Sequence, residues 1–270
     1  MFNKILKVSL IKEQVDAKIE HKIFDGYEIH LLGKEKDDFS LLEKLSCKPI
    51  KTFHFPIEKC RIGTFEIGDD KKYIEQLLHE CQKYHSGVIL HHGGGFDFNE
   101  QKETELNLAI KNKDLQILIE QMKEKTIPLY IENASIASCK DVVDMTNKLS
   151  HIFNYRLIYP LLDICHYQIS ANQINSKETN LAKTLDLFNS NDVKLHFCDS
   201  VGCGRNIFGG IHGSNFKYNQ PLMKEILDHL KGFRKNIDLI LEVDEENYNE
   251  PKNAVWLAER INEYLDEDKF

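Results

Sequence analysis

Residues 126–166 read TIPLYIENASIASCKDVVDMTNKLSHIFNYRLIYPLLDICH and contain one complete strand-helix-strand unit. Two apolar runs, TIPLYIEN from Thr126 and YPLLDICH from Tyr159, flank a segment that opens with Ser138 and Asp141. Serine followed three residues later by an acidic residue is the capping-box pattern that starts a helix. Both runs are almost continuously apolar rather than alternating, as parallel strands buried on both faces require. This stretch therefore predicts a parallel sheet covered by helices.

The same alternation of strand and helix continues along the whole chain. Six further β-rich apolar runs are ILKVSLI from Ile5, FDGYEIHLL from Phe24, PIKTFHFPI from Pro49, SGVILHH from Ser86, DVKLHFCD from Asp192 and IDLILEVDE from Ile237. Helical periodicity lies between most of them, as at Leu115, Leu118, Ile119 and Met122, and we expect Asp69 to cap the helix after the third strand. Because right-handed crossovers between parallel strands close at eight, the sequence predicts an α/β fold, a single (β/α)8 TIM-barrel domain over residues 1–270.

Composition limits the classes of protein that this chain can belong to. Hydrophobic residues make up 41% and charged residues 29%, which is typical of a globular protein. Lys4, Lys7 and Lys12 interrupt the N-terminal apolar residues, no 18-residue apolar stretch follows, and the seven cysteines form no CxxC pair. We therefore expect a cytoplasmic protein with reduced thiols and no membrane partner, and leave open whether it forms a homo-oligomer. The net charge of −8 makes nucleic acid a less favoured partner.

Histidine and acidic residues recur where the predicted strands end. Catalytic groups of such barrels lie at the C-terminal ends of the strands. The residues at these ends are Glu28, His30, His54, His91, His92, Glu132, Asn133, Asp163, His166, His196, Asp199, Glu242 and Asp244, and His212 follows in the loop GGIHGSNF. Several carboxylates that meet in one axial pocket cannot all stay ionised without a countercharge, and a divalent cation is the simplest one.

The types of side chain suggest a ligand set for one divalent ion. Glu132, Asp163, His196 and Glu242 offer three carboxylates and one imidazole, which suit Mn²⁺, Mg²⁺ or Co²⁺, while the imidazole also admits Zn²⁺. A second group could bind further zinc ions, contact substrate or orient the inner carboxylates, and consists of His54, His91, His166, His212, Asp199 and Glu28. We favour substrate contact for His166 and His212, and rate metal binding and a structural role equally for His54 and His91.

These motifs give the chain a resemblance to a known superfamily. In order along the strands, DGYEIHL, HFP, LHHGG, YIEN, LLDICH, LHFCDS and LILE resemble the xylose isomerase-like TIM barrels. That superfamily contains sugar and sugar-phosphate isomerases and epimerases, and also the endonuclease IV type of abasic-site endonuclease (AP endonuclease family 2). Each motif is weak alone, whereas their order on successive strand ends is specific. The resemblance implies an enzyme with a metal site at these ends.

The resemblance to endonuclease IV has one clear departure. It implies that His54, His91, Glu132, Asp163, His166, His196, His212 and Glu242 occupy positions that hold three zinc ions in that family. The family's Asp-x-His after the seventh strand reads Gly210, Ile211, His212 here, so the third ion would lose a carboxylate. The loop GKEKDD also lacks the arginine and aromatic residues that would enter a DNA duplex.

The resemblance to the ketose epimerases implies a single metal held by Glu132, Asp163, His196 and Glu242, with His166 at the substrate. Here Ser138 stands where those enzymes often have a second acidic group, so we expect an unfamiliar substrate. We expect a metal-dependent isomerase or epimerase acting on a sugar or related polyol through metal-stabilised enediolate proton transfer, with Glu132 and Glu242 as base and acid. The alternatives are a zinc phosphodiesterase acting on abasic DNA, and a metal-dependent hydrolase or lyase of the same fold.

Overall fold

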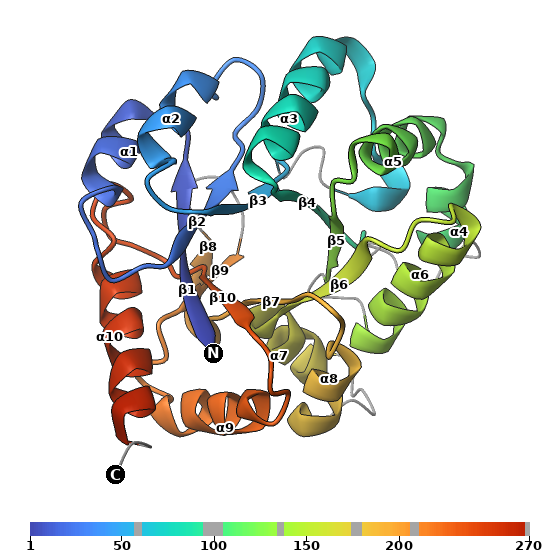
Figure 1. Cartoon of the computed structure of the whole chain (residues 1–270). Coiled ribbons are helices and arrows are strands. Elements are labelled where there is room, and N and C mark those ends of the chain that lie inside the picture. The colour runs from blue at the N-terminus through green and yellow to red at the C-terminus, as the bar shows by residue number, and fades with distance from the viewer. Residues whose placement is uncertain (57–60, 94–104, 134–137, 174–179, 206–210, 268–270) are drawn as a thin grey trace.

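The fold is a closed (β/α)8 barrel. The computed structural model describes residues 1–56, 61–93, 105–133, 138–173, 180–205 and 211–267. Eight parallel strands hydrogen-bond in a ring, with helices standing around the outside (Figure 1). The strands, in their order around the ring, are β1 (Phe2–Ser9), β2 (Gly26–His30), β3 (Ile50–His54), β4 (Gly87–His91), β5 (Leu129–Glu132), β6 (Ile158–Asp163), β7 (Val193–His196) and β10 (Ile237–Leu241). All eight predicted strands are thus present, and the predicted fold class is confirmed.

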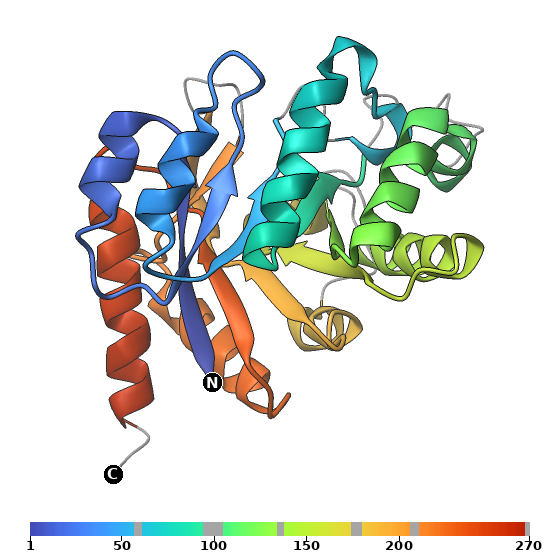
Figure 2. The same cartoon turned by 45° about the horizontal axis from the view of Figure 1, so that its top comes forward.

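The helices follow the strands along the chain and cover the barrel from outside (Figure 2). Their bounds are α1 (Lys12–Lys18), α2 (Leu42–Leu45), α3 (Lys71–Tyr84), α4 (Glu105–Lys111), α5 (Lys113–Lys125), α6 (Cys139–Ile152), α7 (Ile164–Gln173), α8 (Leu181–Leu187), α9 (Gln220–Lys231) and α10 (Lys252–Glu267). The predicted apolar face of α5 is the face that it buries against the barrel: Leu115, Leu118, Ile119 and Met122. None of the described helices is long and apolar enough to cross a membrane.

One predicted helix cap is confirmed and another is wrong. The Ser138 hydroxyl accepts a hydrogen bond from the Asp141 N–H, 3.1 Å away, at the start of α6. Asp69 does not cap α3, because the chain first forms a 3-10 turn over Gly68–Asp70 and the helix begins at Lys71. Asp70 occupies the N-cap position instead, without a capping hydrogen bond from its side chain.

Two strand boundaries differ from the prediction. The sixth strand ends at Asp163 rather than His166, because the Asp163 carboxylate accepts a hydrogen bond from the His166 N–H (2.6 Å) and caps α7 directly. Cys165 is therefore in a helix, not in a strand. After β7 the chain forms an antiparallel hairpin that the sequence did not predict, with strands β8 (Asp199–Arg205) and β9 (Ile211–Ser214).

Successive side chains of a strand point in alternate directions, so the side chains that point into the barrel form layers. An apolar floor crosses it, formed by buried residues of five strands: Ile5, Ile89, Tyr130, Leu161 and Ile240. Side chains two residues apart on a strand point the same way. Each floor residue is followed, two positions on, by a polar residue one layer nearer the C-terminal ends: Lys7, His91, Glu132, Asp163 and Glu242. The floor thus supports a polar layer where the sequence predicted the functional groups.

Candidate metal centre

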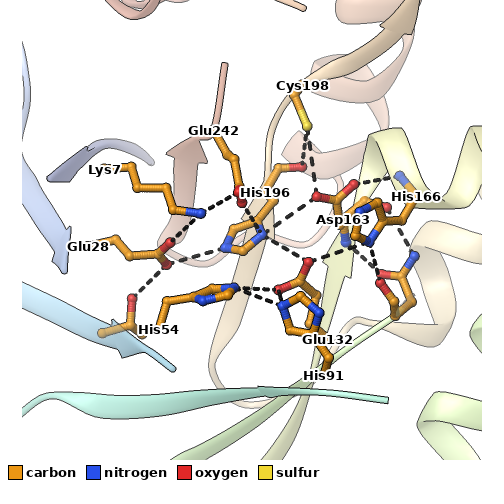
Figure 3. Close-up of polar contacts among 12 residues, drawn as sticks. Lys7, Glu28, His54, His91, Glu132, Asp163, His166, His196, Cys198 and Glu242 are labelled. Atoms are coloured by element: carbon orange, nitrogen blue, oxygen red, sulfur yellow. Dashed lines mark hydrogen bonds and ion pairs between the residues drawn. The ribbon is translucent and has the colours of Figure 1, made fainter. Parts of the chain in front are cut away.

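Four predicted ligands point toward one another inside the barrel (Figure 3). Glu132 ends β5, Asp163 ends β6, His196 ends β7 and Glu242 directly follows β10. Each offers one ligand atom, and these atoms all lie within 4.8 Å of one another. All four side chains are buried, with His196 fully enclosed. The strand register explains the meeting, because Asp163 and His196 are paired across β6 and β7.

The ring of His196 lies at the middle of this four-residue cluster. Its Nδ1 atom is 2.7 Å from Glu242 Oε2, 3.3 Å from Glu132 Oε1 and 3.6 Å from Asp163 Oδ2. Despite these three neighbours, Nδ1 makes no hydrogen bond of good geometry to any described residue. Three carboxylates and one imidazole are the donor set of a hard divalent cation or zinc. The residues present therefore fit a divalent metal ion.

The carboxylates and the imidazole of the cluster affect one another's ionisation. Burial opposes ionisation of Glu132, but the imidazoles of His196 and His91 outweigh it and hold the pKa of Glu132 well below its usual range. Burial likewise opposes a charge on His196, yet Glu132, Glu242 and Glu28 raise the pKa of His196 well above its usual range. Without a metal, the His196 imidazolium is thus the countercharge of the carboxylates. A bound metal must displace that proton, because an imidazole ligates through its neutral form.

Two further histidines approach Glu132 from the neighbouring strands. The Nε2 atoms of His54 and His91 each lie 3.2 Å from Glu132 Oε2, and 2.9 Å from each other. His54 Nδ1 donates to the Phe55 carbonyl at 2.9 Å, so the lone pair of the neutral ring is on Nε2. Burial and the nearby Lys7 lower the pKa of His54, which favours that neutral form. His54, Glu132 and His196 form a second group with metal-ligand spacing.

The other predicted site residues are placed differently. His166 lies beside the cluster on α7, with Nδ1 donating to the Asn133 carbonyl (2.9 Å) and 3.7 Å from Glu132 Oε1. Asp199 is fully buried but belongs to neither group with metal-ligand spacing among the described residues. The backbone of His212 lies in β9, whereas its side chain and Gly210 are outside the described residues.

Glu28 supports the ring of His196 from the side opposite the cluster. Its carboxylate is fully buried, accepts a hydrogen bond from Thr52 Oγ1 (2.9 Å) and lies 3.3 Å from His196 Nε2. Carboxylates that hold the far nitrogen of a metal-binding imidazole fix the orientation of its ring. Glu28 therefore orients His196 and is not itself one of the four clustered ligands.

Two residues shape the cluster in ways that the sequence did not predict: Asn133, named above only as a strand-end residue, and Lys7. Asn133 ties β5 to β6, because its Oδ1 accepts from the Asp163 N–H (2.6 Å) and its Nδ2 donates to the Asp163 carbonyl (3.1 Å). Lys7 projects from β1, and its Nζ forms an ion pair with Glu242. The available signal for Lys7 was its position two residues after Ile5, which places the two side chains on the same face of the strand.

Comparisons with solved structures agree on the fold. An L-ribulose 3-epimerase aligns with a TM-score of 0.64 at 14% identity, over 100% of this chain and 96% of that one. An IolI protein with a bound zinc atom aligns with a TM-score of 0.54 at 14% identity, over 95% and 96%. A xylose isomerase domain containing protein from Salmonella typhimurium aligns with a TM-score of 0.52 at 12% identity, over 97% and 96%.

No protein-family model and no curated protein matches the sequence. The likeness therefore rests on structure, and at these identities it concerns the fold. The resemblance predicted from the strand-end motifs is confirmed at that level: the chain has the same barrel fold as these solved structures.

Proposed function

We propose that this protein is a divalent-metal-dependent isomerase or epimerase that moves a carbon-bound proton of a sugar or related polyol. The observation that carries the proposal is the convergence of Glu132, Asp163, His196 and Glu242 at the C-terminal ends of neighbouring strands. The L-ribulose 3-epimerase has the same fold, which supports a ketose or similar polyol as the class of substrate.

The cluster would hold the metal through Glu132, Asp163, His196 and Glu242. Three carboxylates favour Mn²⁺, Mg²⁺ or Co²⁺, whereas the imidazole also admits Zn²⁺, the metal bound in the IolI protein of the same fold. When bound, such a cation supplies positive charge that stabilises the oxygen anion developing as a carbon-bound proton leaves.

The protein's own groups would then transfer the proton. Glu132 is ionised at neutral pH because His196 and His91 outweigh the effect of burial on its pKa, and an ionised carboxylate is the form that accepts a proton. Glu242 reaches His196 from β10 and Glu132 reaches it from β5. We assign these two carboxylates as base and acid on the two sides of the reacting carbon. His166 is assigned to the substrate oxygen that gains charge.

Deuterium uptake tests this assignment. The metal-loaded protein is incubated in heavy water with a panel of ketoses, and exchange of carbon-bound protons is followed by NMR. Glu132→Gln should lower the exchange rate by roughly 10²- to 10⁴-fold, the usual contribution of a general base. Glu245→Gln is the matched control, since Glu245 is a buried carboxylate outside both groups with metal-ligand spacing, and it should leave exchange unchanged. Exchange that persists in Glu132→Gln would remove Glu132 from the mechanism.

A second candidate function is a zinc phosphodiesterase acting on abasic DNA. The observation that favours it is the approach of His54 and His91 to Glu132 Oε2, since these three side chains would be available to hold a further zinc ion. The same preparation is assayed for incision of an abasic oligonucleotide and for metal content. Robust incision that depends on Glu132, with two or three zinc ions per chain, would replace the isomerase proposal. One metal ion per chain with no incision would support the isomerase proposal.

A further inference from the structure

Lys7 is a buried lysine in the polar layer of the barrel. Its side chain is 10% exposed, and Nζ donates to Glu242 Oε1 and lies 3.9 Å from Glu28 Oε1 (Figure 3). Neither the proposed metal ligation nor the proposed proton transfer uses this cation. Burying an ammonium group is costly unless it is paired, so its position calls for a specific role.

The strand register fixes Lys7 between the two carboxylates. Lys7 is paired with Glu28 across β1 and β2, while β10, which leads into Glu242, lies on the other side of β1. From outside the barrel, the Lys18 ammonium on α1 donates to the Lys7 carbonyl at 2.9 Å. The backbone of β1 is therefore anchored at the residue whose side chain enters the cluster.

The carboxylate of Glu242 is shared between two partners. Its Oε1 accepts from Lys7, and its Oε2 lies 2.7 Å from His196 Nδ1, inside the four-residue cluster. The lysine therefore turns one oxygen away from the cluster and leaves the other pointing into it. Glu28 is shared in the same way, with Oε1 toward Lys7 and Oε2 toward His196.

The charge of the polar layer points to the same role. Glu28, Glu132, Asp163 and Glu242 are four buried carboxylates within one group of contacts. A divalent cation balances two negative charges, and the neutral imidazole of a metal-binding His196 balances none. The Lys7 ammonium, in contact with Glu242 and 3.9 Å from Glu28, adds one positive charge to this layer.

We propose that Lys7 is a positioning residue of the metal centre, which restricts Glu242 to a one-oxygen ligand and supplies a fixed positive charge beside the bound cation. This inference rests on the proposed function, because it requires a metal at the four-residue cluster. Without the lysine, Glu242 Oε1 is released and the carboxylate can offer both oxygens. The coordination number of the bound ion should then rise.

Visible absorption of bound Co²⁺ reports this change without any assay of activity, since the intensity of its d–d bands falls as the coordination number rises. Metal-stripped proteins are loaded with one equivalent of Co²⁺, and the spectra are compared at equal bound metal. Lys7→Met should absorb more weakly than wild type. Lys7→Arg, which keeps the cation, should retain the wild-type spectrum. Lys7→Gln, whose neutral amide holds Oε1 less strongly, should lie between them.

Lys4→Met is the matched control for the loss of a buried lysine. Lys4 lies on the same strand and pairs with Asp25 at 3.0 Å. Its variant should keep the wild-type spectrum. If Lys7→Met does not fold, Lys7→Gln decides the question. Co²⁺ spectra identical to wild type in the Lys7 variants would overturn the role of Lys7 while leaving the metal site intact, whereas failure of wild type to bind Co²⁺ would overturn the proposed function itself.

Discussion

Glu245 is a buried carboxylate with a structural role, three residues after the predicted metal ligand Glu242. Its two oxygens accept hydrogen bonds from the Asn253 N–H (2.9 Å) and the Ala254 N–H (2.8 Å), at the first turn of α10. Burial raises the pKa of Glu245 to about 7, although both N–H groups and the Lys18 ammonium act in the opposite direction. A carboxyl group that holds its proton up to neutral pH links folding to pH.

The sign of that link can be tested. From about pH 4.5 to about pH 7 the unfolded chain loses the Glu245 proton while the folded protein keeps it, so the contribution of Glu245 to stability falls as pH rises through this window. Glu245→Gln removes the titration. The free energy of unfolding of the variant relative to wild type should therefore increase by roughly 3 kcal/mol between pH 4.5 and pH 7.5, at about 1.4 kcal/mol per unit of pKa shift. Urea denaturation at both pH values measures it, and a difference independent of pH would contradict the raised pKa.

Some residues of the candidate site could be predicted from the sequence, and others could not for a physical reason. Glu132, Asp163, His196 and Glu242 end successive apolar runs, so their meeting follows from parallel strands alone. The alternation of side chains places Lys4 and Lys7 on opposite faces of β1, but it does not say which face is turned into the barrel. The strand register shows that Lys7 faces the candidate metal centre and that Lys4 pairs with Asp25.

Helix caps show how much a single element depends on its side-chain contacts. Ser138 caps α6 with one hydrogen bond to Asp141 N, whereas Asn112 caps α5 and also joins it to the loop after β3. Asn112 Oδ1 accepts from Leu115 N (3.0 Å), and its Nδ2 donates to the carbonyls of Phe65 (2.8 Å) and Gly63 (3.3 Å). Asn112 therefore satisfies groups on two segments at once.

Replacing these caps should have unequal costs. Ser138→Ala loses one capping bond and should lower the free energy of unfolding by about 1 kcal/mol. Asn112→Ala loses a comparable cap and also leaves two part-buried carbonyls without that donor, so it should cost roughly 2–3 kcal/mol. Thermal or urea unfolding of the two variants measures this, with Asn180→Ala as a control for a cap that makes one bond, to Lys183 N. Equal losses would show that the loop contacts of Asn112 contribute nothing.

The spacing of apolar residues predicted the helices and strands better than the residues at which they begin and end. The buried face of α5 follows directly from the spacing of its apolar residues. The 3-10 turn before α3, the abrupt change from β6 to α7 at Asp163 and the β8–β9 hairpin were not predicted. Each of them depends on a few local hydrogen bonds, which leave no periodic pattern in the sequence.

Inside the barrel, polar groups lie in two layers. Ile5, Ile89, Tyr130, Leu161 and Ile240 form the apolar floor between them. Above it lies the candidate metal centre, and below it Lys194 donates to Asp238 (2.7 Å) and Asp192 (3.1 Å). Because the barrel is closed, the ends of β5 and β10 lie near each other. Glu132 and Glu242, which are far apart in the sequence, therefore meet in the upper layer. The proposed function requires that the upper layer bind a divalent metal.

Calorimetric titration of the metal-stripped protein with Mn²⁺ tests that claim most directly. Asp192→Asn, which changes a carboxylate on the other side of the floor, serves as the matched control. We expect one tight site per chain in wild type and in Asp192→Asn, and loss of that site in Asp163→Asn, because Asp163 provides one of the four clustered ligands. Affinity should also rise with pH, since the raised pKa of His196 means that the metal displaces a proton. No binding to wild type, or equal binding to Asp163→Asn, would contradict the account.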